Sequence, residues 1–465
     1  MRSLRSSFHR RLRQRDESGA ALIAVTILIV VLTSIIAVTT SNAINDLNRA
    51  TKTERRNAAY SAAEAGVADY VAKVTEDPTY FLRFVHPAES TRRSPGGFTA
   101  VGASSWNGSL AWSYPSPNNL WRALPNGFEY NLEIVPPATG LTGVKIIATG
   151  RKTGSPNDWR KLEAVVRPAS VADFSFISNG DQSFGTGATT DGKMYVGVDS
   201  SGIAHDLNHR GNAYGSLFAE GQVVGMDASR LHNGAETFDS DSDPSIRSVV
   251  PTALNFNLFT NSLIDIKAAA SGAGLLLDQP GLDAWRLTFN ADSTVTVERC
   301  TRSWGTIAEG APICVPFSSE SMPANGAIWS EQTVIVRGVV KGRVTVATNY
   351  DVVIGEDVLY ADPDQDVLGL VARENVLIAY WAPNNLTVSA SMIAQNGSYR
   401  SVYSWLAKSG TFHHLGSGAS NIAGFMTMFA TRNYEYDTKL LLYPPPFFPT
   451  FGDAYTIVSF RELTP

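Results

Sequence analysis

The chain has 465 residues, of which 44% are hydrophobic and 17% are charged. This composition excludes an intrinsically disordered protein, and the length suffices for two or three packed domains. The 38 Gly and 23 Pro are close to ordinary usage, which excludes collagen-like and low-complexity chains. The formal net charge of -5 conceals an asymmetry, because six Arg crowd residues 1–17 and leave the remainder more acidic than the whole. An acidic body without a basic stripe argues against nucleic acid as the main partner.

An uncharged apolar stretch follows the basic residues. Residues 20–40 contain no charged side chain, and as a helix they would span about 30 Å, the thickness of a bilayer's hydrocarbon core. Because the Arg residues precede the stretch, the positive-inside rule keeps the N-terminus in the cytoplasm and sends the body outward. A secretory signal peptide has a shorter apolar run and a cleavage site of small residues. We therefore predict a single-pass protein of the cytoplasmic membrane, with the lipid bilayer as a partner.

The helical pattern continues beyond the apolar stretch. Apolar side chains recur at helical spacing among charged ones, at Ile44, Leu47, Ala58, Ala62, Ala65, Tyr70 and Val74. The pattern stops at Asp77-Pro78, since Pro cannot continue a helix. We expect a basic leader at 1–19 and one long helix over 20–77.

This N-terminus resembles those of type IV pilin-like proteins. The features that carry the resemblance are a basic leader ending in Gly19, the apolar stretch, and the Ala-rich run 62–66 around Glu64 on the long helix. Within that group the chain is most similar to PilX-type minor pilins and pilus assembly proteins. The resemblance implies that a prepilin peptidase cuts after Gly19 and leaves Ala20 as the mature N-terminus. It also implies other pilin-like subunits as partners.

One position departs from the family pattern. Major pilins carry Glu at the fifth mature position, where this chain has Ala24. The resemblance then favours an initiating, tip or accessory subunit over the bulk fibre protein. Small residues such as Ala21 and Ala24 allow helices to approach closely, and we expect Ala62 and Gly66 to extend that contact. The alternative is a plain single-pass anchor followed by a juxtamembrane helix.

The region 78–168 reads as a small β region. Three strands are expected at 128–135, 144–149 and 159–166, separated by Pro- and Gly-rich turns. The preceding segment, 79–127, is rich in Pro, Ser, Asn, Gly and Trp and is expected to be irregular and packed. A long helix with a small antiparallel sheet is what the pilin-like resemblance implies.

Short strands with Gly, Asn or Asp corners recur after Pro168. They occupy 169–250 and 327–465 and predict a parallel β-solenoid body in two parts, with an antiparallel sandwich as the alternative. The expected fold class is therefore mainly β with a long N-terminal helix. Runs at 339–347, 360–366, 368–372, 436–437 and 444–449 resemble an uncharacterised solenoid domain found behind PilX-type N-termini. That resemblance covers roughly 170–463 and implies architecture without catalytic residues.

An insertion with the two cysteines separates the two solenoid parts. Residues 251–326 are expected to hold a helix, which ends near Gly272, and strands at 285–290 and 294–299. Cys300 and Cys314 enclose 13 residues, and outside the cytoplasm a disulfide between them would contribute roughly 3 kcal/mol. Zinc would need two further ligands, and no His or Cys lies nearby. A free pair is the alternative.

Candidate chemistry is sparse. The Asp-rich loops 239–243 and 362–366 suggest calcium, but neither completes an EF-hand. Glu356 and Asp357 are adjacent, so on a strand they point to opposite faces and do not form a glycosidase pair. The pair His413-His414 has no metal-site spacing, and no nucleophile or phosphate-loop motif occurs. The aromatic residues at 447, 448 and 451 are expected to cover the last coil. We therefore predict no catalytic residue, no cofactor and no metal.

The sequence as a whole predicts a non-enzymatic pilin-like subunit or assembly factor. It would belong to a type IV pilus or a related envelope fibre and display its solenoid outward, with a surface ligand that the sequence does not identify. One alternative is a membrane-anchored surface adhesin or glycan-binding protein. A less favoured alternative is a secreted carbohydrate-active β-helix enzyme.

Overall fold

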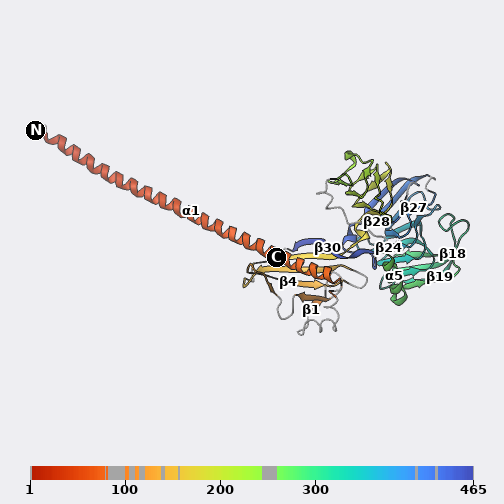
Figure 1. Ribbon diagram of the computed structural model, residues 1–465. Helices are drawn as coiled ribbons and strands as arrows, with labels where there is room; N and C mark the ends of the chain where they lie inside the picture. The colour runs from red at the N-terminus through yellow and green to blue at the C-terminus, as the bar shows by residue number, and fades with distance from the viewer. Residues whose placement is uncertain are drawn as a thin grey trace.

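The computed structural model describes residues 3–78, 80–81, 100–103, 110–114, 121–137, 142–155, 158–242, 259–403, 407–424 and 428–463. The chain is mainly β with one long N-terminal helix, as predicted. The helix projects from one side, a small antiparallel sheet lies along its last turns, and a larger β body occupies the far end (Figure 1).

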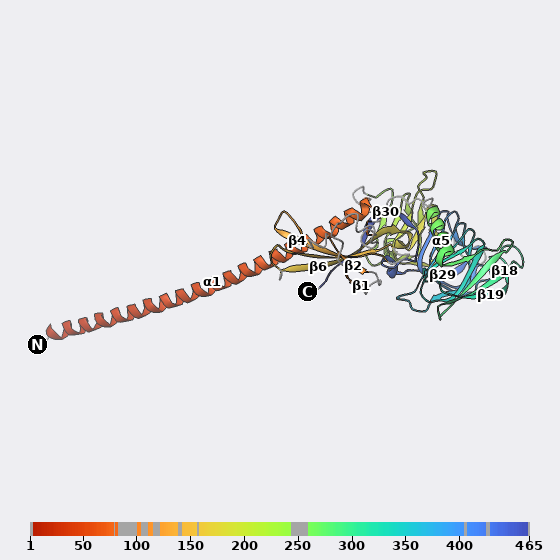
Figure 2. The same cartoon turned by 90° about the horizontal axis from the view of Figure 1, so that it is seen from below.

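Helix α1 (Ser3–Glu76) begins inside the basic leader and runs without interruption to the residue before Asp77. It is therefore longer than the predicted 20–77 at its N-terminal side. Its end agrees with the prediction: the Asp77 N–H donates to the Lys73 carbonyl at 3.0 Å, and Pro78 follows. Most of α1 extends away from the molecule, and only its C-terminal part lies on the sheet (Figure 2).

The small sheet is antiparallel and contains all three strands predicted for the region 78–168. Its strand order is β1-β2-β4-β5-β6-β30, and β3 pairs with β4. The strands are β1 (Ala100–Ala103), β2 (Leu110–Tyr114), β3 (Arg122–Ala123), β4 (Phe128–Val135), β5 (Val144–Lys152), β6 (Trp159–Ser170) and β30 (Thr450–Leu463). Much of 79–127, including Trp106, lies outside the described residues.

Strand β30 departs from the predicted domain boundaries. Residues 327–465 were expected to form the second solenoid part and a C-terminal cover, yet β30 leaves the body and pairs antiparallel with β6, with Leu463 opposite Lys161. Without β30, the long strand β6 would present a row of unpaired backbone groups at the sheet edge. The C-terminal strand therefore completes the sheet that the N-terminal helix covers.

The first half of the body is built from short parallel strands. One ladder contains β7, β10, β13 and β15, a second contains β9 and β12, and a third contains β8, β11 and β14. The bounds are β7 (Phe176–Ser178), β8 (Gln182–Phe184), β9 (Ala188–Thr190), β10 (Met194–Val196), β11 (Leu207–His209), β12 (Asn212–Ala213), β13 (Leu217–Ala219), β14 (Val223–Val224) and β15 (Thr237–Phe238). Single-turn helices η1 (Val171–Asp173) and η2 (Ala228–Arg230) flank them.

The second half contains longer parallel ladders. One runs β16-β20-β22-β24-β26-β28 and another runs β17-β21-β23-β25-β27. The bounds are β16 (Leu275–Leu277), β17 (Ala284–Asn290), β20 (Ala327–Ser330), β21 (Thr333–Val340), β22 (Arg343–Thr348), β23 (Val352–Tyr360), β24 (Val367–Ala372), β25 (Val376–Ile378), β26 (Leu386–Ala394), β27 (Tyr399–Ser401) and β28 (Lys408–Ser420). Parallel pairing in these ladders is not what the sandwich alternative predicts.

The two halves of the body are joined at its centre by parallel pairing of strands that are far apart in the sequence. Strand β28 pairs in parallel with β7, with Gly418 opposite Phe176, and β29 (Phe429–Tyr436) pairs with β9. The last long strand of the second half thus lies beside the first strand of the first half. The chain therefore enters and leaves the body at one central level, next to the small sheet.

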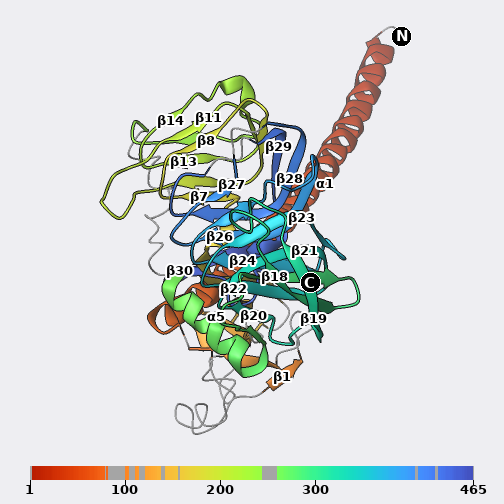
Figure 3. The same ribbon diagram turned by 90° about the vertical axis from the view of Figure 1, so that its right-hand side faces the viewer.

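Separate segments cover the outer faces of the ladders. Helix α5 (Phe259–Ala273) lies against β20 and β22 (Figure 3), and its Leu263 and Ile266 pack with Trp329. The segment after η4 (Thr438–Leu441) also packs there: Phe448 is buried in the same cluster and Phe447 lies partly buried against it, while the Phe451 side chain is outside the described residues. On the adjoining side, β18 (Thr294–Thr301) and β19 (Ile313–Ser321) form an antiparallel hairpin with β17.

Candidate assembly helix and its attachment

The stretch 22–40 of α1, hereafter the apolar half of the helix, is apolar and exposed. Large aliphatic side chains from Leu22 to Leu47 are uncovered, with Leu22 70%, Val31 47% and Leu47 67% exposed. An 18-residue window of this helix has a mean hydropathy of 2.9, and none of it is buried by the rest of the chain. Such a surface is unfavourable in water, so this half requires a lipid or protein environment. Its length and composition suit a membrane-spanning helix.

Four hydroxyl groups in this half donate hydrogen bonds within the helix. Thr26 donates to the Leu22 carbonyl at 2.8 Å, and Ser34 donates to the Val30 carbonyl at 2.7 Å. Thr33 and Thr39 donate in the same way to the carbonyls four residues before them, each at 2.9 Å. These hydroxyls therefore need no external partner when the segment lies in an apolar environment.

The residues predicted for processing and assembly divide into two groups. Gly19, Ala20 and Ala21 lie within α1, but their side-chain surroundings are outside the described part of the structure, while Ala24 is exposed. Ala62 is buried at 1% exposure against the chain's own sheet.

Gly66 belongs to the same intramolecular contact as Ala62. It is buried, and a Cβ placed on it would lie 2.7 Å from the Tyr130 ring and 2.9 Å from the Leu132 side chain. The expectation that Ala62 and Gly66 extend a contact between subunits is thereby corrected. Small residues allow close approach to any neighbour, and here that neighbour is β4.

Gly150 on β5 is a position that the sequence interpretation did not identify. A Cβ there would lie 2.1 Å from the Ala59 carbonyl oxygen and 2.5 Å from the Ala63 backbone nitrogen. The helix backbone thus approaches the strand so closely that only Gly fits. The available signal was a Gly within an alternating strand pattern, which often marks a close backbone approach.

Polar contacts fix the end of α1 to the sheet. The Tyr130 hydroxyl donates to Asp69 at 2.9 Å, and Arg122 pairs with the same carboxylate at 3.0 Å. Burial and the Asp69 carboxylate raise the pKa of Tyr130, so the phenol stays a hydrogen-bond donor. Tyr455 on β30 donates to the Pro78 carbonyl at 3.1 Å. Strands β3, β4 and β30 therefore hold the C-terminal part of the helix and Pro78 just beyond it.

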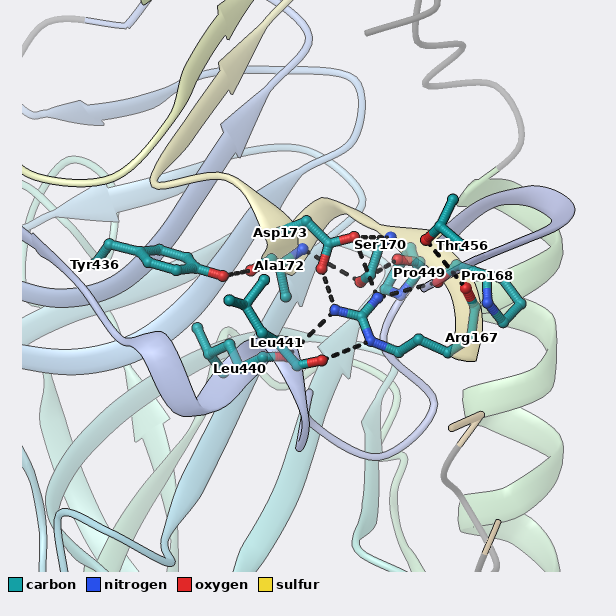
Figure 4. Close-up of polar contacts among 10 residues, drawn as sticks. All are labelled: Arg167, Pro168, Ser170, Ala172, Asp173, Tyr436, Leu440, Leu441, Pro449 and Thr456. Carbon is teal, nitrogen blue, oxygen red and sulfur yellow. Dashed lines mark hydrogen bonds and ion pairs between the residues drawn. The ribbon is translucent and has the colours of Figure 1, made fainter. Parts of the chain in front are cut away.

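A buried arginine joins the small sheet to the body (Figure 4). Arg167, at the end of β6, is fully buried, and its guanidinium pairs with both oxygens of Asp173. It also donates to the Leu441 carbonyl at 3.0 Å and to the Leu440 carbonyl at 3.4 Å. A buried charge is tolerated when such bonds satisfy it. Arg167 thus links the strand that leaves the sheet to the segment that returns from the body.

Neighbouring contacts strengthen the same junction. The Ser170 hydroxyl donates to the Pro449 carbonyl at 3.0 Å, and the Ser170 N–H donates to Asp173 at 2.8 Å. Tyr436 donates to the Ala172 carbonyl at 2.9 Å, and burial raises the pKa of its phenol. The two chain crossings therefore form one hydrogen-bonded connection between α1's sheet and the body.

The cysteines lie far from this junction. Cys300 on β18 and Cys314 on β19 are directly opposite each other and are joined by a disulfide, with Cα atoms 4.1 Å apart. The bond closes the loop 301–313 beside the β21-β23-β25-β27 ladder.

The other candidate groups serve as structural contacts. In the loop 362–366, Asp366 accepts hydrogen bonds from the backbone of Gly342 and Asp362 at 2.7 and 2.6 Å. Glu356 pairs with Arg337 and Asp357 accepts from the Thr387 N–H. Asp243 of the first Asp-rich loop lies outside the described residues. Across the described ranges, no three His, Cys, Asp or Glu side chains converge as metal ligands would.

The two adjacent histidines have different environments. His414 is buried, its Nε2 lies 2.9 Å from the Ala390 carbonyl, and burial lowers the pKa of the imidazole to about 4. His413 is partly exposed and lies 3.1 Å from Glu435. They are therefore not two ligands of one site.

The chain has little detectable similarity to known proteins. No protein-family model and no curated protein matches the sequence. Among solved structures, the chain is similar to the crystal structure of the competence-associated pilin ComZ from Thermus thermophilus at 14% sequence identity. The match covers 88% of this chain and 98% of that chain, with a TM-score of 0.29. A TM-score of this size does not establish a shared fold.

Proposed function

We propose that the protein is a non-enzymatic, pilin-like subunit that assembles through the N-terminal half of α1. The observation that carries the proposal is the division of this helix. Residues 22–40 are apolar and exposed, and the C-terminal turns of the helix pack on a sheet that β30 completes. Such a helix can exchange lipid for neighbouring helices without disturbing the body, because the two environments contact separate parts of it.

The proposal includes processing and orientation. A prepilin peptidase cuts after Gly19 in the basic leader, and Ala20 becomes the N-terminus. Before assembly the leader stays in the cytoplasm and the body lies outside the cytoplasmic membrane. Ala24 replaces the acidic residue of major pilins, which supports an accessory, PilX-type role in a type IV pilus or a related envelope fibre.

The body is the displayed part, and we propose that it is a β-solenoid. The support is the parallel stacking of strands from successive coils, such as β22, β24 and β26, whose apolar side chains pack in one core. Stacked coils bury faces that no single coil covers alone. The position of the body beyond the sheet leaves its outer surface free for a ligand.

N-terminal sequencing tests the proposal. Protein from the membrane fraction and from fibres sheared off the cell surface is sequenced separately. We expect the sheared protein to begin at Ala20. Protein that retains the leader and never leaves the lipid fraction contradicts the proposal and favours a permanently anchored surface protein.

A pair of variants tests the helix itself. Ala24→Arg, and separately Ala21→Arg, places a charge in the apolar half, at a cost of about 2.5–3.5 kcal/mol near the centre of a bilayer and less toward its edge. We expect loss of insertion or of surface display. Thr53→Arg, in the exposed polar half of α1, is the matched control and is expected to assemble normally. Normal display of both Ala variants contradicts the model.

A further inference from the structure

The outer side of the body carries a cleft beside the disulfide-closed loop. The cleft has a volume of about 380 Å³ and lies between residues 302–309 of the loop and the β21-β23-β25-β27 ladder. A second cleft of about 640 Å³ adjoins it and shares Asp283 and Thr333 with it. Both volumes fall within the range of ligand pockets. The two adjoining clefts are hereafter called the loop groove.

The disulfide and several hydrogen bonds hold the loop residues 302–309 that form one side of this groove. The disulfide closes its base, the Trp381 indole N–H donates to the Ile307 carbonyl at 3.1 Å, and the Tyr380 N–H donates to the Ala308 carbonyl at 2.9 Å. The Tyr403 hydroxyl donates to Glu309 at 2.8 Å, although Tyr403 has a φ of 53°, which is unfavourable for a residue other than Gly. The groove is therefore preformed.

One corner of each coil contributes a polar residue to the groove. Thr333 is the first residue of β21, and Asp351 and Asn375 immediately precede β23 and β25. The three residues stack in register because those strands pair in parallel. Both the backbone and the side-chain amide of Asn375 donate to Asp351 Oδ1 at 2.9 Å. Neighbouring strands lie about 4.8 Å apart, so a chain that follows the groove meets a polar group at that interval.

This interval distinguishes two kinds of polymer. An extended peptide presents side chains on one face at roughly 6.7 Å, twice the rise per residue, and so falls out of register with the row. A sugar ring has a length closer to the interval between strands. The row therefore fits an oligosaccharide better than a peptide strand.

The chemistry of the groove indicates a ligand that both donates and accepts hydrogen bonds. The part-buried guanidinium of Arg400 makes no hydrogen bond or ion pair with any described residue, and Asp351 Oδ2 accepts none among them. Buried Val353 and Leu377 supply an apolar floor, and Tyr350, 55% exposed, supplies a ring face in the second cleft. Hydroxyl groups satisfy both donors and acceptors, while the faces of sugar rings pack on apolar and aromatic surfaces.

The charge balance further limits the ligand. Acidic residues outnumber basic ones in the lining of the loop groove. The acidic residues are Asp278, Asp283, Glu309, Glu331 and Asp351, and the basic residues are Lys267, Arg302 and Arg400. Two of the three cations are already paired, Lys267 with Glu331 and Arg302 with Asp283. A polyanion would be repelled, so we propose that the loop groove binds a neutral oligosaccharide that runs across successive coils.

Binding measurements on the detergent-solubilised full chain test this proposal. The probes are immobilised neutral oligosaccharides of two to six sugar rings, uronic-acid oligosaccharides of the same lengths, and an extended peptide of similar length. We expect neutral oligosaccharides to bind with an affinity that rises with the number of rings, and the uronic acids and the peptide to bind more weakly. Absence of binding to every neutral oligosaccharide, or binding of the peptide alone, overturns the proposal.

Three variants locate the binding. Arg400→Ala should raise the dissociation constant about tenfold, because a charge-assisted hydrogen bond is lost. Tyr350→Ala should raise it about fivefold, because a ring face is lost. Tyr214→Ala is the matched control, because Tyr214 is also exposed, at 39%, and lies in the other half of the body. Matching thermal unfolding midpoints exclude misfolding. Equal affinities in the three variants place the binding elsewhere and overturn the proposal.

Discussion

The small sheet and the body bury their cores in different ways. The antiparallel sheet covers one face with α1 and leaves the other face to ion pairs, such as Lys145–Glu163 at 2.8 Å and Arg151–Glu129 at 2.7 Å. The parallel body buries strands on both faces, so α5, the disulfide loop and the segment near Phe448 cover its outer sides. This difference follows the general rule that parallel sheets need cover on both faces. The hydrophobic core of the small sheet is therefore buried by one helix, whereas several short segments bury the outer sides of the body.

The largest expected effect concerns the junction between the two regions. Arg167→Met leaves Asp173 and three backbone carbonyls, those of Pro168, Leu440 and Leu441, without their buried partner, and we expect it to lower the free energy of unfolding by about 3–5 kcal/mol. Arg461→Met is the matched control, because its pair with Glu163 is 63% exposed on the arginine side and should contribute about 1 kcal/mol or less. Urea unfolding of the solubilised chain measures both. Equal losses in the two variants would contradict the role assigned to the junction.

Acid should weaken the body through its buried histidines. Burial lowers the pKa of His209 and of His414 to about 4, so the folded chain keeps both imidazoles neutral where the unfolded chain binds protons. The unfolded state therefore binds more protons between pH 6.5 and 4, and the free energy of unfolding decreases as the pH falls through this window. The loss is roughly 3 kcal/mol for each histidine.

Variants of the adjacent histidines check this pH dependence. His414→Asn should reduce the dependence of the urea midpoint on pH between 6.5 and 4, whereas His413→Asn, at the partly exposed neighbour, should retain it. A wild-type midpoint that stays constant over this range would show that burial does not control these groups.

Removal of the disulfide should act locally in the body. Replacing both cysteines by Ser removes a short loop closure, which we expect to cost about 3 kcal/mol in the chain-entropy model. Hydrogen exchange should rise in β18, β19 and the loop 301–313, while the small sheet stays protected. Increased exchange in β4 and β5 to the same degree would show that the two regions are not independent.

Substitution of Gly150 should have the smallest effect of these variants, and it measures how closely α1 approaches β5. Gly150→Ala introduces a methyl group against the backbone of Ala59 and Ala63, and we expect a loss of about 2–3 kcal/mol. Gly272→Ala is the matched control, since no atom lies within 4 Å of the added Cβ and Ala favours the helix by about 0.5–1 kcal/mol. Calorimetry should show opposite shifts. A neutral Gly150→Ala would mean that α1 does not approach β5 this closely.

Local patterns in the sequence predicted the elements of this fold well. The end of α1 followed from Pro78, and the strands 128–135 and 144–149 followed from alternation that the structure shows as alternating burial on β5. The pairing of β30 with β6 was not predictable in this way, because an edge strand's own pattern does not identify a partner nearly 300 residues away. The pairing of β28 with β7 was not predictable for the same reason.

The candidate site was predicted only in part. The apolar half of α1 was evident from composition, but Ala62 and Gly66 were assigned to another subunit because small residues look alike in either contact. Burial of Arg167 was not evident, although Ser170 and Asp173 form a capping box whose spacing is readable in the sequence. That spacing is typical of a turn, but it gives no sign of the arginine that the turn holds.

Cysteine accessibility measures whether the apolar half of α1 leaves the lipid and contacts other subunits in the fibre. The chain's two cysteines are joined in a disulfide, so a single new cysteine is the free thiol. We compare Val30→Cys in the apolar half of α1 with Thr53→Cys in the exposed polar half. In intact cells Thr53→Cys should react with a water-soluble maleimide and Val30→Cys should not, and in sheared fibres Val30→Cys should cross-link to another subunit. Equal labelling at both positions, with no cross-link in the fibre fraction, would contradict assembly through this helix.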